Sequence, residues 1–447
     1  MEKWKMVMKV KKLNLYLIIC LIFSIIISGY FYKTREKEIV ISVGMFAGSA
    51  WDVPYSNCYD IMDNAILKFE NKHPGVKVKY VNGIMKEDYS EWLSEQLLKG
   101  KGPDVFFILP EDFNMLSNVG SIKNLNKFIE KDNEFNTERF YRTSLKSGQY
   151  EEKQYAIPYE SAPVMMFVNK TLLNKEEISM PDNNWTFEDF YNVCRKVTKD
   201  TNGDGIIDQF GCYGYTWRDA VCSNGAMLFN EEGTKAYFRN EKVQEAVGFV
   251  KKLNALNNGY NVTAKDFDNG KVAFYPLPFP EYEAYKIYPW KIKKFFNFDW
   301  ECIKMPAGKY GTNASEIRTV LVGINSKTKE EKLAWKFLKS LTYDEEIQRQ
   351  IFNYSQGVSV LKDVTNSDET LDILKKNAPN GTYINMNVLN GVMENGTVTP
   401  RFRKYQTVME MADNILNQYV NTDVDDDNLN YYLSKVDREV DNILKNK

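Results

Sequence analysis

The sequence predicts an α/β fold in which strands and amphipathic helices alternate along the chain. Residues 39–43 and 105–109 are short apolar runs of the kind found in buried strands. Residues 76–80 alternate apolar side chains with lysines, as a half-buried strand does. Residues 62–69 and 92–98 place apolar side chains on one helical face. Three strands joined by two helices over about 70 residues predict right-handed βαβ units.

The rest of the chain continues this alternation. We expect strands at 164–168 and 320–324, and helices that begin near Thr186 and near Ala334. The tail is predicted to be mostly helical from 408 to 444, with a break at 421–428, where an acidic run forms a solvated linker.

Composition narrows the classes of function. The 447 residues allow two or three domains, and 58 basic against 60 acidic residues leave a formal net charge of -2. Such a balance lacks the cationic surface of a nucleic-acid-binding protein. His73 is the single histidine, which excludes Ser-His-Asp chemistry with a second histidine and multi-histidine metal sites. Aromatic residues reach 14%, a stock that suits both a core and a surface that stacks flat ligands.

The amino terminus indicates export. Five lysines precede an apolar stretch at residues 13–32 that is long enough to cross a bilayer as a helix. A cleaved signal peptide fits the same pattern, and we interpret residues 1–36 as a retained membrane anchor. Tyr30 stands where a lipoprotein signal would have its acceptor cysteine, and Cys20 follows Ile19 rather than a small residue, so we expect no lipidation.

The cysteines do not form a zinc pattern, because no Cys-x-x-Cys pair is present. A disulfide between Cys212 and Cys222 is conceivable in an oxidising compartment. We favour the alternative that most cysteines are small buried apolar residues.

Four stretches, in this order, resemble one known family. They are residues 65–78 (AILKFENKHPGVKV), 102–107 (GPDVFF), 155–160 (YAIPYE) with 165–170 (MMFVNK), and 323–327 (GINSK) with 333–339 (LAWKFLK). Two shorter stretches, 270–273 (GKVA) and 305–308 (MPAG), fit between them. The sequence resembles the bacterial extracellular solute-binding proteins of ABC importers, in the branch that includes the maltose-binding protein.

The resemblance implies a type II periplasmic-binding-protein-like fold of two interrupted α/β lobes. It places the first lobe at 38–160 and 320–362, and the second at 161–319 and 363–447. A ligand would bind in the cleft between them, beyond the carboxyl ends of the strands. Closure of the lobes about the crossing segments would present a different surface to the membrane transporter.

Candidate ligand contacts follow from this placement. A sugar needs aromatic faces and charged or amide groups. We looked for aromatic, acidic and amide side chains in four places: after the predicted strands, at the predicted crossing between lobes, in the aromatic stretch 213–224, and at residues 276–280 with the residue that follows. At this last place the family often has Gly-x-Trp, whereas this chain reads PLPFP. In that order the candidates are Trp51, Asp52, Glu111, Asp112, Tyr159, Glu160, Trp217, Asn224, Phe279 and Glu281.

The segment 200–208 (DTNGDGIID) resembles the first part of a helix–loop–helix calcium site. Oxygen ligands at the first, third, fifth and ninth positions, a backbone carbonyl at the seventh and a glycine at the sixth fit Ca²⁺, but the twelfth position is Gly211 rather than glutamate. A turn without metal remains open, because Asp, Asn and Gly form such turns unaided. We predict a structural calcium with ligands Asp200, Asn202, Asp204, Ile206 and Asp208.

These observations favour a non-catalytic solute-binding subunit of an ABC importer. We expect it to act as a monomer, anchored at the extracytoplasmic face of the membrane, and to deliver a carbohydrate to the permease. Two alternatives stay open. A secreted glycoside hydrolase also needs aromatics and paired carboxylates, and a sensor subunit would present its ligand to a membrane kinase.

Overall fold

The computed structural model describes residues 21, 23, 24, 38–53, 57–287, 298–376, 383–422 and 428–445. The predicted anchor or signal segment, residues 1–36, lies outside these ranges except for Leu21, Phe23 and Ser24. None of the helices in the described ranges has both the length and the apolar character needed to cross a bilayer.

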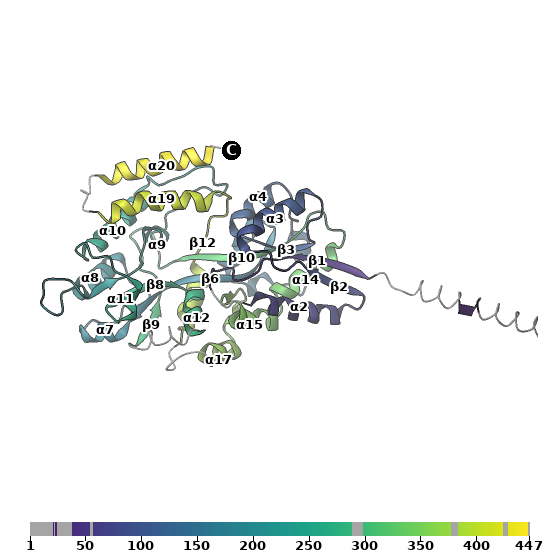
Figure 1. Ribbon diagram of the computed structural model, residues 1–447, viewed down its shortest axis with the longest axis horizontal. Coiled ribbons are helices and arrows are strands. Elements are labelled where there is room, and N and C mark those ends of the chain that lie inside the picture. The colour runs from purple at the N-terminus through teal and green to yellow at the C-terminus, as the bar shows by residue number, and fades with distance from the viewer. Residues whose placement is uncertain are drawn as a thin grey trace, which may run out of the picture.

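Within the described residues, ten strands form one mixed sheet (Figure 1). Its main path runs β2-β1-β3-β10-β6-β8-β7, while β9 and β11 pair with β6 and β12 pairs with β10. The bounds are β1 Ile39–Gly44, β2 Val76–Tyr80, β3 Val105–Ile108, β6 Ala156–Asn169, β7 Phe210–Cys212, β8 Val272–Pro278, β9 Trp300–Ile303, β10 Glu316–Ile324, β11 Val358–Ser359 and β12 Thr397–Val398. A separate hairpin joins β4 (Gln149–Tyr150) to β5 (Lys153–Gln154).

The register confirms the predicted βαβ start of the chain. β1 is parallel to β2, with Ile39 opposite Val76, and parallel to β3, with Val43 opposite Val105. β10 is antiparallel to both β3 and β6. The sheet is therefore mixed rather than wholly parallel.

Helices cover the sheet and confirm the predicted stripes at 62–69, 92–98 and 334–341. In the first half of the chain they are α2 Cys58–Lys72, α3 Lys86–Leu98, α4 Pro110–Asn118, α5 Asn126–Lys131, α6 Arg142–Ser147, α7 Lys170–Lys175, α8 Phe187–Val197 and α9 Trp217–Ser223, with a 3-10 turn at Thr137–Arg139. Further along they are α10 Glu241–Ala255, α11 Ala264–Asp268, α12 Phe279–Ile287, α14 Glu331–Thr342, α15 Glu345–Tyr354, α16 Lys362–Thr365, α17 Asp368–Lys376, α18 Met386–Asn395, α19 Tyr405–Val420 and α20 Leu429–Lys445.

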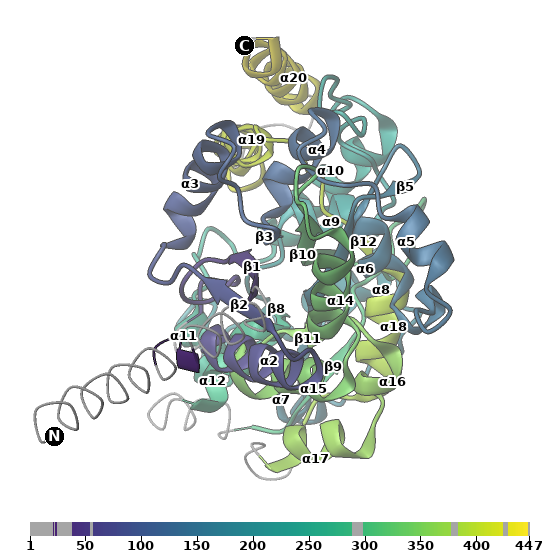
Figure 2. The same cartoon turned by 90° about the vertical axis from the view of Figure 1, so that its right-hand side faces the viewer.

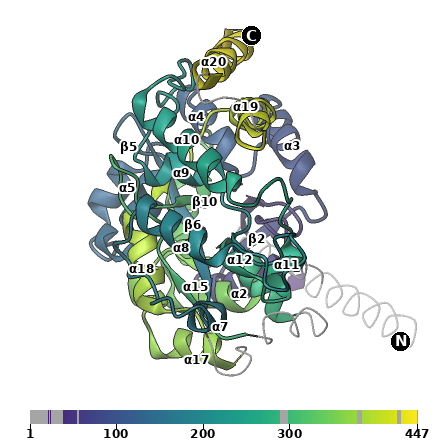
Figure 3. The same ribbon diagram turned by 90° about the vertical axis from the view of Figure 1, so that its left-hand side faces the viewer.

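The predicted helical tail is confirmed as α19 and α20. These two helices pack against each other, and α19 also packs on α10. Figures 2 and 3 show them stacked at one end of the molecule, above α10. Their buried residues, including Leu416 and Leu433, belong to the same hydrophobic cluster as Val247 of α10.

The buried side chains form three hydrophobic clusters. The first draws on residues 41–162 and 320–364, around β1, β3 and the N-terminal part of β6. The second and third draw mainly on residues 165–317 and 374–440, with Tyr141, Phe352 and Val358 as additions from outside those ranges. The strands β6 and β10 run through both regions and lie at the middle of the ribbon in Figure 1. The clusters divide the buried residues but do not test the predicted lobe boundaries, which remain a prediction.

Candidate functional site

Polar side chains gather where β6 and β10 pass from the first cluster to the others. We call this place the crossing and define it as residues 160–163 of β6 and 316–320 of β10. Arg318 lies opposite Ala162 in the register. Ile317 belongs to the third cluster and Val320 to the first, so Arg318 lies on the strand where the two cores meet. Arg318 is exposed, and its guanidinium carbon lies 5.8 Å from the centroid of the Trp51 ring.

The loop after β1 separates two neighbouring predicted site residues. Trp51 is buried, and its backbone N–H donates to Ser49 Oγ at 2.9 Å. Asp52 has a φ of 58°, and its exposed carboxylate pairs with Lys86 Nζ of α3 at 2.7 Å. The ring therefore reaches the crossing, while the carboxylate is engaged at the start of a helix.

The acids after β3 lie at the N-terminus of α4, which Pro110 begins. Asp112 is buried and accepts a hydrogen bond from Ser90 Oγ. Burial raises the pKa of Asp112, and the neighbouring Glu111 raises it further, while Ser90 and Arg403 lower it. Glu111 is half-buried. Neither acid is among the residues that line the groove described below.

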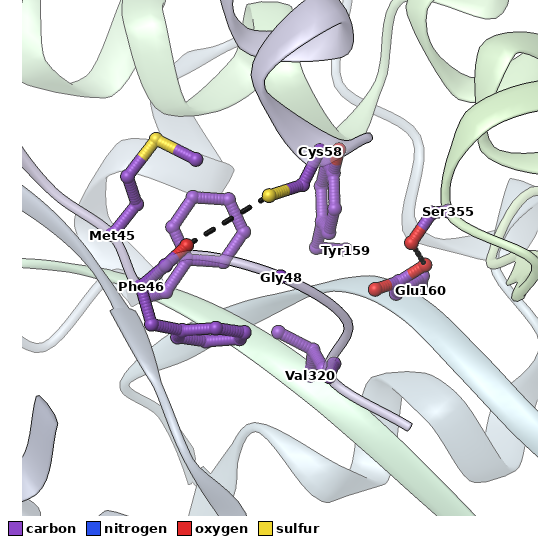
Figure 4. A pocket seen from close by; sticks show the side chains of 10 residues that line it. Met45, Phe46, Gly48, Cys58, Tyr159, Glu160, Val320 and Ser355 are labelled. Atoms are coloured by element: carbon purple, nitrogen blue, oxygen red, sulfur yellow. Dashed lines mark hydrogen bonds between the residues drawn. The ribbon is translucent and has the colours of Figure 1, made fainter. Parts of the chain in front are cut away.

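Tyr159 and Glu160 line a small cavity of about 20 Å³ in the first cluster (Figure 4). This volume suits a single water molecule, not a sugar. Ser355 Oγ donates to the Glu160 carboxylate, and the Trp51 indole lies beside it without a hydrogen bond of full geometry. Burial raises the pKa of Glu160 to about 7, against these two donors, which lower it. A Cβ at position 357 would lie 2.5 Å from Glu160 Oε2, so glycine is needed there.

A much larger groove, of about 700 Å³, opens beside the second cluster. Three segments form it: residues 212–217 between β7 and α9, residues 250–262 at the end of α10, and residues 417–422 at the end of α19. Exposed Tyr260 stacks on Phe210 with ring centroids 4.6 Å apart. Within the described residues, no side-chain hydrogen bond engages four amides of this groove: Asn257, Asn258, Asn261 and Asn417. Free amides beside an aromatic face can bind hydroxyl groups and C–H patches.

Sequence reasoning missed most of this groove. The signal was the run 254–261 (NALNNGYN), which holds four asparagines and a tyrosine. Asn254 connects two walls, because its Nδ2 donates to Asn421 Oδ1 at 2.9 Å. The predicted stretch 213–224 supplies the third wall.

Two predicted contacts in that stretch lie inside the protein. Trp217 is 1% exposed, and its Nε1 donates to Asp413 Oδ1 at 3.0 Å, so it supports the groove from below. Arg218 Nε also donates to Asp413 Oδ1, at 2.9 Å. Asn224 is fully buried, where it donates to the Lys242 carbonyl and accepts from the Tyr310 N–H. The structure does not bring Asn224 to the groove.

The predicted contacts at the start of α12 diverge. Phe279 is fully buried in the third cluster and packs on Phe352. Glu281 is exposed in the first helical turn. The structure thus brings Trp51, Tyr159 and Glu160 together, and leaves Phe279 and Glu281 on a different element.

The predicted calcium loop is an exposed turn whose carboxylates accept backbone N–H groups. Asp200 accepts from Gly203 and Gly205, each at 2.7 Å, and these bonds lower its pKa. Asp208 accepts from the N–H and hydroxyl of Thr201, which lower its pKa too. Asp204 Oδ1 accepts from the Ile206 N–H at 2.8 Å. Across the described ranges, no group of three or more His, Cys, Asp or Glu side chains is arranged to hold a metal ion.

The five cysteines in the described residues are free, so the conceivable Cys212–Cys222 disulfide is not formed in this structure. Cys194 and Cys302 are buried. The other three, Cys58, Cys212 and Cys222, are half-buried.

Two hydrophobic regions joined by paired crossing strands, with a polar groove beside one of them, define a fold suited to holding a solute. The model of the bacterial extracellular solute-binding protein family matches residues 56–347. Because this match covers more than half of the chain, the chain belongs to that family. The family is an extracytoplasmic one, and its members are binding proteins.

Solved structures share the fold at low sequence identity. The sugar-binding protein MalE of Xanthomonas citri is 14% identical, with a TM-score of 0.73 over 91% of this chain and 97% of that one. UspC of M. tuberculosis is 14% identical, with a TM-score of 0.74 over 90% of this chain and 100% of that one. An ABC substrate-binding protein of Listeria monocytogenes, in complex with cycloalternan, is 19% identical, with a TM-score of 0.64 over 92% and 100%. At these identities the likeness establishes the fold.

Proposed function

We propose that this protein captures a carbohydrate outside the cytoplasm and delivers it to the permease of an ABC importer. The observation that supports this most is the groove at 212–217, 250–262 and 417–422, which is lined by exposed Tyr260 and by four amides that no side-chain hydrogen bond engages within the described residues. Solved proteins of the same fold are named for sugars or were solved with them. The protein binds without turnover, works as a monomer, and is held at the membrane by residues 1–36.

A thermal-shift screen of the full-length protein tests this proposal. Mono- and oligosaccharides, amino sugars and peptides are the probes. A ligand at a hundredfold excess over its dissociation constant adds about 2.7 kcal/mol to the free energy of unfolding. Loss of the shift over time, with products formed, would favour a hydrolase. No shift with any sugar would remove the carbohydrate from the proposal.

Groove variants locate the binding site. We expect Asn261→Ala and Asn417→Ala each to weaken the dissociation constant of the sugar found by about threefold to tenfold, the usual value of one hydrogen bond. Asn430→Ala, at an exposed position of α20, is the matched control and should leave affinity unchanged. Equal affinity of all three variants by calorimetry would place the sugar elsewhere.

We also propose that the loop 200–208 binds calcium weakly, in a structural role. The supporting feature is its oxygen spacing, because its carboxylates already accept backbone N–H groups. Added Ca²⁺ should raise the melting temperature relative to EGTA, and Asp204→Asn should reduce that rise. An equal rise with Mg²⁺, or none with Ca²⁺, would contradict a calcium site.

A further inference from the structure

We propose that the captured solute bears an anionic group, a carboxylate or a phosphate, and that Arg318 holds this group against the face of Trp51. The inference rests on the proposed function and adds the chemical class of the solute, together with a second contact at the crossing, because neither Arg318 nor Trp51 lines the groove. It comes from the position of one exposed guanidinium at the crossing and from the groups that surround it.

The backbone fixes the position of Arg318. β10 is paired with β6 throughout the crossing, and the residues that flank Arg318, Ile317 and Thr319, are buried. Successive side chains of a strand point to opposite faces, so the side chain of Arg318 lies on the other face from Ile317 and Thr319, and it is exposed there. The backbone of Arg318 is therefore fixed by the sheet, while its guanidinium group is exposed.

The Trp51 ring orients the guanidinium group of Arg318. The Arg318 guanidinium carbon lies 5.8 Å from the ring centroid, within the range of a cation–π contact. Because Trp51 is itself buried to 7% exposure, the ring is a firm support. A guanidinium held by one face keeps its N–H groups along its edge, where they can donate two parallel hydrogen bonds to a carboxylate or a phosphate.

The charge of Arg318 is not compensated within the described residues. No carboxylate there lies within 4.0 Å of its guanidinium, whereas nearby Arg218 pairs with Asp413 and Arg401 pairs with Glu231. Glu316 is half-buried two positions earlier on the same strand and does not reach Arg318 at ion-pair distance. An incoming anion would therefore supply the counter-charge that the protein omits.

Tyr405 of α19 interacts electrostatically with Arg318. It is half-buried, and its pKa is raised by burial and by Glu316, while Arg218 and Arg318 act in the opposite direction. The Tyr405 hydroxyl therefore stays protonated at neutral pH.

The test compares charged and neutral ligands with the same backbone. Calorimetry on the full-length protein would use oligogalacturonate against its methyl ester, and sugar phosphates against the parent sugars. We expect the charged member of one pair to bind about tenfold or more tightly, because hydrogen bonds to charged groups contribute about 1.5–3 kcal/mol. Preference within the first pair identifies a uronate, and within the second a phosphate.

Variants assign the effect to Arg318. Arg318→Gln should lose this charge preference and keep affinity for the neutral member, and Arg318→Lys should recover only part of it, because lysine lacks the planar fork. Arg195→Gln, at an exposed end of α8, is the control and should behave as the parent protein does. An unchanged melting temperature of Arg318→Gln would show that the fold is intact.

The outcomes separate this inference from the proposed function. Binding of neutral sugars as tightly as charged ones, or a charge preference that survives in Arg318→Gln, overturns the inference and leaves carbohydrate capture standing. No binding of any sugar, charged or neutral, overturns both.

Discussion

The small cavity at Glu160 and the wide groove at Tyr260 show how differently polar residues act in one molecule. The cavity holds about 20 Å³ and encloses a carboxyl group among apolar walls. The groove holds about 700 Å³ and exposes amides to solvent. Enclosure changes the proton affinity of a side chain, whereas openness leaves its hydrogen bonds available to a solute. We therefore expect variants of the cavity to alter stability with pH, and variants of the groove to alter affinity.

The largest effect on the free energy of unfolding is expected at Trp217, the buried ring beneath the groove. Trp217→Ala should lower the free energy of unfolding by about 3–5 kcal/mol, because it removes a buried ring and the hydrogen bond to Asp413. Trp217→Phe keeps most of the volume and should cost about 1 kcal/mol, the value of one hydrogen bond. Urea unfolding measures both. Equal losses in the two variants would mean that the Asp413 contact, rather than packing, supports the groove.

The cavity should add a pH dependence to stability. The folded protein keeps the Glu160 proton up to a pKa of about 7, whereas the unfolded chain loses it near the usual value of 4.5. Between these values the folded state binds more protons, so stability falls as pH rises, by about 3 kcal/mol in total. Glu160→Gln cannot ionise and should remove this fall between pH 5 and pH 8.

Urea midpoints at the two pH values give the comparison. Glu91→Gln, at an exposed position of α3, serves as the control and should retain the slope of the parent protein. If Glu160→Gln keeps that slope as well, another group is responsible and the cavity is not the source of the pH dependence.

The reactivity of two cysteines can be used to compare the accessibility of the cavity at Glu160 with that of the groove at Tyr260. Burial raises the pKa of Cys58, which lines the cavity, from 9.0 to about 11, so its thiolate fraction at neutral pH is about a hundredfold lower. Cys212 lines the groove. Iodoacetamide should label Cys212 faster than Cys58 by a large factor, measured peptide by peptide in a mass spectrometer. Faster labelling of Cys58 would show that the cavity opens readily.

Most helices and strands were predicted correctly, because their hydrophobic periodicity depends only on residues that are near in sequence. The strand at 105–109 and the helix at 62–69 agree with β3 and α2 to within a few residues at most. β6 was predicted only from 164 to 168, because Pro158, Glu160 and Pro163 interrupt its apolar run. Pairing with β10 on one side and β8 on the other keeps this segment extended.

The candidate site was harder to predict because exposure depends on the whole fold. Asn224 and Asn257 are the same residue type, yet one is buried with its side chain hydrogen-bonded and the other lines a groove. Trp51 and Asp52 are adjacent and still point to different partners. Arg318 was missed because the predicted strand began at 320, two residues after it.

The interrupted first cluster also bears on the order in which the protein can fold during synthesis. Its core needs Leu321, Phe337 and Leu361, which are made more than 270 residues after Ile41 and Val43. A nascent chain therefore cannot complete this core until most of the polypeptide has left the ribosome, and contacts so distant in sequence form slowly. Such a delay keeps the chain unfolded for longer, which is the state that a translocation channel for secreted proteins accepts.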